Sequence, residues 1–161
     1  MPSKSSRSRA GQDRRNEAGW YRPLTMVIAI IALAIGTYRF AKPALFGVDM
    51  RIEAALTGIL VSHEKALTIP AEDLMILYNS VTSVEALPSR PQLKKMNGLD
   101  GLKTLIGKFQ GEGLGEVQVY ARNYRDPATK FVKLTTTTAT YILTPADAVA
   151  FVGIVQSQIK K

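Results

Sequence analysis

The stretch GKFQGEGLGEVQVYARN, residues 107–123, decides the fold. After its glycines, Val117, Val119 and Ala121 alternate with polar or aromatic residues, which is the period of a half-buried β-strand rather than of a helix. A dinucleotide-binding loop requires a helix directly after its glycines, and a P-loop ends in Gly-Lys followed by Ser or Thr. Neither pattern occurs here, so we interpret the glycines as a turn and a bulge between curved strands.

Short segments with strand character lie on both sides of this stretch. The segment LPSRP, residues 87–91, and the pair Asp126-Pro127 are typical of loops. Residues 70–79, PAEDLMILYN, are predicted to form one or two helical turns, because Pro70 precedes two acidic residues. The expected strands are residues 51–61, 65–69, 81–87, 130–134 and 139–143, the last two joined through the four threonines at 135–138.

The clearest helix signal begins at Thr144. This residue is a suitable N-cap, Pro145 suits the first helical position, and Asp147 is favoured near a helix N-terminus by the helix dipole. Apolar residues then recur at helical spacing along one side. They are Ala148, Phe151, Val152, Val155 and Ile159. We expect this helix to cover the sheet, and a helix that binds a membrane surface or a partner is the alternative.

A second helix signal lies near the N-terminus, where residues 24–35 read LTMVIAIIALAI. A helix that is apolar on every side needs lipid or a large core around it. Residues 20–38 would form a rod of about 28 Å, close to the hydrocarbon thickness of a bilayer, with aromatic residues at both ends. We therefore expect a single transmembrane helix. A cleaved signal peptide and a helix buried in a protein core are the alternatives.

The positive charge is concentrated before this helix. Residues 1–22 hold six basic and two acidic residues, whereas the residues from Val48 onward hold 13 basic and 11 acidic ones. Six basic residues before the span, against only Arg39 and Lys42 directly after it, predict a cytoplasmic N-terminus and a C-terminal domain outside the cell membrane. The tail also lacks large apolar residues, so we expect disorder. A nucleic-acid-binding arm is the alternative, but no aromatic residue for base stacking precedes Trp20, and we expect no nucleic-acid partner.

The composition gives little support to catalysis. The chain has no cysteine and a single histidine, His63, which excludes a cysteine nucleophile, a zinc-thiolate centre and a multi-histidine metal site. The adjacent Glu72 and Asp73 would point in different directions, and Glu112 and Glu116 have no nucleophile near them in the sequence. We expect that the protein is not an enzyme and that it binds neither a cofactor nor a metal. A carboxylate-dependent enzyme is the alternative. We interpret His63 as a surface loop residue.

Two motifs in a fixed order resemble the bacterial pleckstrin-homology-like (PH-like) domain family. They are GKF with GLG, within residues 107–115, and YILTPAD, residues 141–147. The resemblance implies an α+β fold, mainly antiparallel β, in which a partly open barrel is closed by the C-terminal helix. It also implies noncovalent binding of peptides, other subunits or lipid head groups, and no catalysis.

The sequence therefore predicts three segments: a disordered basic cytoplasmic tail at 1–19, a transmembrane helix with its juxtamembrane connection at 20–46, and a PH-like domain at 47–161. We expect the domain to act as a protein-interaction or assembly subunit, whose partner is another protein or a second copy of the chain. Recognition of anionic lipid head groups is the alternative. The candidate binding residues are all basic: Arg90, Lys94, Lys95, Lys103 and Lys108.

Overall fold

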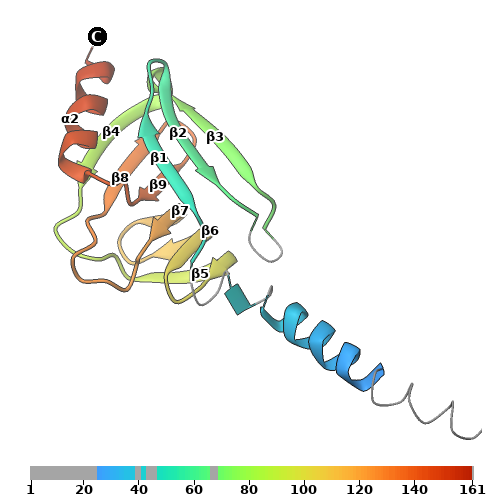
Figure 1. The fold of residues 1–161 in the computed structure, drawn as a ribbon. Coiled ribbons are helices and arrows are strands. Elements are labelled where there is room, and N and C mark those ends of the chain that lie inside the picture. The colour runs from blue at the N-terminus through green and yellow to red at the C-terminus, as the bar shows by residue number, and fades with distance from the viewer. Residues whose placement is uncertain (1–24, 39–40, 43–46, 66–68, 161) are drawn as a thin grey trace, which may run out of the picture. The chain divides into compact units, whose positions relative to one another are not determined.

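The computed structural model describes residues 25–38, 41–42, 47–65 and 69–160 (Figure 1). The chain divides into two compact units, Met1–Phe40 and Ala41–Lys161. The predicted tail at 1–19 and residues 43–46 of the predicted connection lie outside the described residues.

The first unit contains a helix over residues 25–38. Its large apolar side chains are exposed on every side, from Val27 at 51% to Leu33 at 72%. The predicted span at 20–38 begins outside the described residues, which contain its part from Thr25 onward. No helix formed by the described residues is long and apolar enough to cross a membrane.

The second unit begins with an antiparallel sheet of β1 (Met50–Ala54), β2 (Gly58–His63) and β3 (Glu72–Leu77), in the order β1-β2-β3. The predicted helical turns at residues 70–79 are wrong, because β3 occupies most of this segment. Ile76 is buried opposite Ile59, while Met75 and Leu77 on the other face are exposed. Residues 74–77, LMIL, are all apolar, so the sequence shows no alternation of polar and apolar residues that would indicate a strand. The two-residue period appears only in the alternating burial of the folded strand.

A short 3-10 helix, η1 (Tyr78–Ser80), leads into a six-stranded sheet with the order β4-β8-β9-β7-β6-β5. All its pairs are antiparallel except β7 with β9, which is parallel. The strands are β4 (Val81–Ala86), β5 (Leu93–Asp100), β6 (Thr104–Gly111), β7 (Gly115–Arg122), β8 (Val132–Thr136) and β9 (Thr140–Leu143). The glycine-rich segment forms the β6–β7 turn, as predicted.

The strands of the expected partly open barrel are divided between two separate sheets, and the described strands form no closed barrel. The β7 strand has β6 and β9 as its neighbours, and among the described strands β1 pairs only with β2. The edge of the three-stranded sheet at β1 therefore stays open. Figure 1 shows the two sheets with the C-terminal helix at one side.

The C-terminal helix, α2 (Ala148–Ile159), covers the core as predicted and packs against β4 and β1. Phe151 and Val155 are buried in the cluster that joins the helix to both sheets. The N-cap differs from the predicted Thr144. The Asp147 carboxylate accepts hydrogen bonds from the amides of Val149 and Ala150 at 3.1 and 3.0 Å, so the helix begins one turn later than expected.

Candidate functional site

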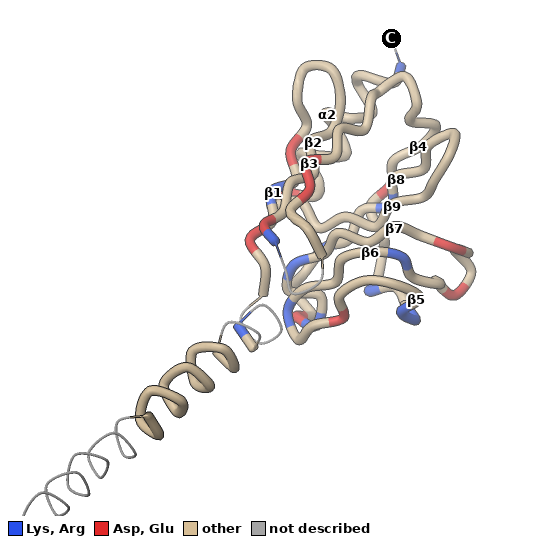
Figure 2. Tube along the Cα trace, turned by 90° about the vertical axis from the view of Figure 1, so that its right-hand side faces the viewer, with Lys and Arg blue, Asp and Glu red and all other residues tan. Residues whose placement is uncertain are grey.

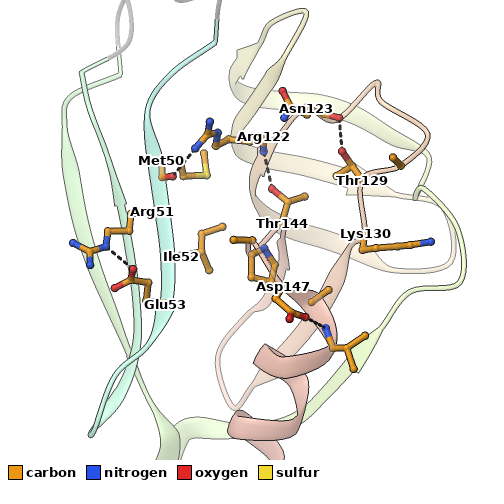
Figure 3. A pocket seen from close by; sticks show the side chains of 15 residues that line it. Met50, Arg51, Ile52, Glu53, Arg122, Asn123, Thr129, Lys130, Thr144 and Asp147 are labelled. Atoms are coloured by element: carbon orange, nitrogen blue, oxygen red, sulfur yellow. Dashed lines mark hydrogen bonds and ion pairs between the residues drawn. The ribbon is translucent and has the colours of Figure 1, made fainter.

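A cavity of about 660 Å³ lies where β1 faces the beginning of α2 (Figure 3). One wall is formed by residues 50–53 of β1, and the other by residues 122–123, 128–130 and 144–149. We call this cavity the β1 groove. It lies along the open edge of β1.

The backbone of β1 offers unused hydrogen-bonding groups to this groove. The Ala55 amide and the Asp49 carbonyl are hydrogen-bonded toward β2. Successive residues of a strand direct their N–H and C=O groups to opposite sides, so those of Met50, Ile52 and Ala54 point away from β2. Within the described residues, no hydrogen bond occupies the N–H or the C=O of Ile52.

Arg122, the last residue of β7, bridges the two walls of the groove. Its Nη1 donates to the Met50 carbonyl oxygen at 3.4 Å, and its backbone N–H donates to Thr144 Oγ1 at 2.7 Å (Figure 3). Thr144 thus positions Arg122 instead of capping the helix. The next residue, Asn123, has a positive φ of 49° and turns the chain away from the sheet.

The acidic side chains of the β1 groove have partners, whereas two of its basic side chains have no ion-pair partner among the described residues. Arg51 Nε lies 2.6 Å from Glu53 Oε1, and the Asp147 carboxylate caps α2. Among the described residues, neither Arg122 nor Lys130 forms an ion pair, and both are exposed. The groove therefore offers two cations to an occupant.

A separate polar cluster joins the two sheets around the buried His63. The interpretation of His63 as a surface loop residue is wrong, because it ends β2 with only 4% exposure. Its Nδ1 lies 3.0 Å from the Glu64 carbonyl oxygen, and its Nε2 has no hydrogen-bond partner among the described residues. Glu72 Oε2 lies 3.8 Å from Nε2 and accepts a hydrogen bond from the Tyr120 hydroxyl at 3.3 Å. This bond joins β3 to β7.

Burial raises the pKa of Tyr120 well above its usual value, and the adjacent Glu72 carboxylate raises it further. The folded protein therefore keeps the Tyr120 proton at a pH at which the unfolded chain loses it. The resulting stability is fully present below about pH 10, the ordinary tyrosine pKa, and is lost as the pH rises further.

We therefore expect Tyr120→Phe to reduce the loss of stability at high pH. At neutral pH the variant should lose about 1 kcal/mol of unfolding free energy with its hydrogen bond. Above about pH 10 its unfolding free energy should fall less steeply than that of the wild type, by up to about 1.4 kcal/mol per pH unit. Urea unfolding at a series of pH values measures both slopes, and equal slopes would contradict the assignment.

The basic residues singled out from the sequence lie on the six-stranded sheet and its connections (Figure 2). Lys94 and Lys95 lie on the edge strand β5, and Lys103 lies in the β5–β6 connection. Lys108 Nζ is 3.1 Å from Glu116 Oε1, and the Arg90 guanidinium lies 5.5 Å from the centre of the Tyr124 ring. None of the five lines the β1 groove.

The candidate carboxylates do not converge. Glu72 and Asp73 are on opposite faces of β3, whereas Glu112 and Glu116 belong to the β6–β7 turn and β7. No group of three or more His, Asp or Glu side chains among the described residues could hold a metal ion. The sequence reasoning missed Arg122 and Lys130. The available signal for Arg122 is its position at the end of the strongly alternating strand.

Comparison with known proteins gives one match. A family model described as bacterial PH domain matches residues 61–159, which include every strand from β3 onward and α2. No curated protein and no solved structure matches the chain.

Proposed function

The chain belongs to the bacterial PH domain family, and from this premise we propose that it is a membrane-anchored module that binds a protein partner noncovalently in the β1 groove. Domains of this family generally mediate binding and are not enzymes. The family assignment does not identify the ligand or the binding surface, so the proposed site rests on the groove itself.

The observation that carries the proposal is the combination of an open strand edge with two uncompensated cations in one cavity. Open sheet edges favour pairing with another chain, and natural proteins usually cover or blunt them. Here the edge faces Arg122 across the 660 Å³ groove, and the Arg122 guanidinium donates to the Met50 carbonyl oxygen of that edge. A protein segment can satisfy both the backbone groups and the charges.

The proposed anchor is the apolar segment at residues 20–38, with the binding domain on the outer side of the cell membrane. The exposed apolar side chains of residues 25–38 support this proposal, since such a surface is unfavourable in water. Resistance of the full chain to alkaline carbonate extraction tests the anchor. Protease digestion of the domain in intact spheroplasts tests the orientation, and protection of the domain there would contradict it.

Affinity purification of the crosslinked full chain from native membranes tests the binding site. We expect the double variant Arg122→Glu and Lys130→Glu to recover at least 10-fold less of a specific protein partner than the wild type does, because it reverses both free charges. The matched control is Lys94→Glu with Lys95→Glu, which makes the same charge change on β5. Equal recovery with the groove variant, or loss only with the control, would contradict the proposed site.

The same variants separate protein binding from recognition of anionic lipids. If the basic residues of β5 bound lipid head groups, the domain would associate with anionic vesicles in a salt-dependent way, and the Lys94 and Lys95 control would abolish that association. We expect no such dependence, because Arg90 and Lys108 of the predicted cluster already have partners in the structure.

A further inference from the structure

We infer that the occupant of the β1 groove is an extended acidic segment of a partner protein, which adds to the open edge of β1 as a further strand. This inference rests on the proposed protein-binding function and specifies the partner's conformation and charge.

The backbone geometry of β1 favours an extended occupant over a helix. Both backbone groups of Ile52 point into the groove without a partner among the described residues, as does the Met50 N–H. A strand placed about 4.8 Å from β1 would pair with these groups. A helix satisfies its backbone groups internally, so it would leave those of β1 unpaired.

The dimensions of the groove limit the paired part of the segment to a few residues. The wall at residues 50–53 of β1 is about 13 Å long at roughly 3.3 Å per residue. Beyond it, α2 packs against β1, and Phe151, Val155 and the half-buried Ala54 belong to the same apolar cluster. The added strand is therefore expected to be short, with its ends outside the groove.

The charges indicate that the segment is acidic. Among the described residues, the Arg122 guanidinium has a neutral carbonyl oxygen as its only partner, while the two carboxylates of the groove, on Glu53 and Asp147, are already engaged. An Asp or Glu side chain on the added strand could accept from Arg122 in the bidentate geometry that guanidinium groups favour. Lys130 on the opposite wall would attract a second acidic residue.

Selection of random heptapeptides displayed on phage against the full chain in nanodiscs tests the inference. We expect enriched peptides to carry Asp or Glu and to bind at least 10-fold more weakly to Arg122→Ala. The best peptide is then synthesised with one backbone N-methyl group at each position in turn. In an added strand only every second amide faces β1, so N-methylation should weaken binding with a period of two residues.

Matched variants of β1 provide the complementary test. Ile52→Pro removes the N–H that points into the groove and spares the hydrogen bonds to β2, whereas Ile52→Val keeps that N–H with a smaller side chain. We expect only the proline variant to lose peptide binding, at least 10-fold, while circular dichroism shows both folded. Should the proline variant not fold, the N-methyl scan decides.

The outcomes separate this inference from the proposed function. Peptides that depend on Arg122 but show no two-residue period contradict strand addition and leave groove binding intact. Enriched peptides without acidic residues, or no enrichment that depends on Arg122, also contradict the inference. The affinity purification described above is independent of these results, so loss of the partner with the groove variant would still support the proposed function.

Discussion

Replacing Gly98 by alanine should destabilise the domain by about 3 kcal/mol, because its backbone conformation and its surroundings both exclude a side chain. Gly98 lies opposite Gly107 in the β5–β6 pair, with φ angles of 130° and 120°. A Cβ on Gly98 would collide with the Ile106 carbonyl oxygen and lie 2.9 Å from the Gly107 Cα. The two strands approach each other this closely only because both residues are glycine.

The matched control for this prediction is Gly113→Ala in the β6–β7 turn. Gly113 also has a positive φ, 69°, but an added Cβ would meet no atom within 4 Å. We therefore expect Gly113→Ala to lower the unfolding free energy by only about 1 kcal/mol, which is the cost of holding an alanine at a positive φ. Urea unfolding followed by circular dichroism measures both variants. Equal losses would show that the close approach of β5 and β6 does not contribute.

Replacing Phe151 by alanine should cost about 4 kcal/mol of unfolding free energy, which is typical for a buried phenylalanine. Phe151 is 5% exposed and joins α2 to both sheets. Because the beginning of α2 is also a wall of the β1 groove, we expect this variant to bind the partner more weakly than the wild type.

Val149→Ala is the matched control on the same helix. Val149 lies two residues earlier but is 80% exposed, so its truncation should change the unfolding free energy by no more than about 0.5 kcal/mol. Thermal unfolding of both variants compares them directly. A loss at Val149 as large as that at Phe151 would contradict the orientation of α2.

Much of the second unit could be predicted from local patterns. The alternation in residues 117–121 gave β7, the prolines gave the loop at 87–91, and the stripe through Phe151 and Val155 gave α2 with its buried face. These features depend on periodicity and turn chemistry within one segment, which can be read without knowledge of neighbouring elements.

The predictions from the sequence are wrong where tertiary contacts, and not the local sequence, determine the secondary structure or the burial of a residue. The acidic start of residues 70–79 favours a helix locally, but pairing with β2 along six residues makes it a strand. His63 resembles a loop residue beside Glu64, yet the register that places it opposite Met50 and Glu72 buries it. The division of the strands into two sheets likewise depends on pairing between distant segments, such as β7 with β9.

The candidate site was largely hidden from the sequence for the same reason. Arg122, Ile52 and Lys130 come from segments far apart along the chain, and only the open edge of β1 brings them to one groove. The basic residues that are prominent in the sequence, such as Lys94 and Lys95, instead lie on β5. The density of charge along the sequence therefore does not locate a binding site whose residues the fold brings together from distant segments.

Site-specific photocrosslinking in living cells tests the central claim, binding of a protein partner in the β1 groove, most directly. A photoreactive phenylalanine analogue is placed at Ala128, which lines the groove, and at Glu112, in the distant β6–β7 turn. We predict a crosslink from Ala128 to an acidic segment of another protein, identified by mass spectrometry and abolished by Arg122→Glu, and none from Glu112. A crosslink to a partner from Glu112 with none from Ala128 would contradict the account.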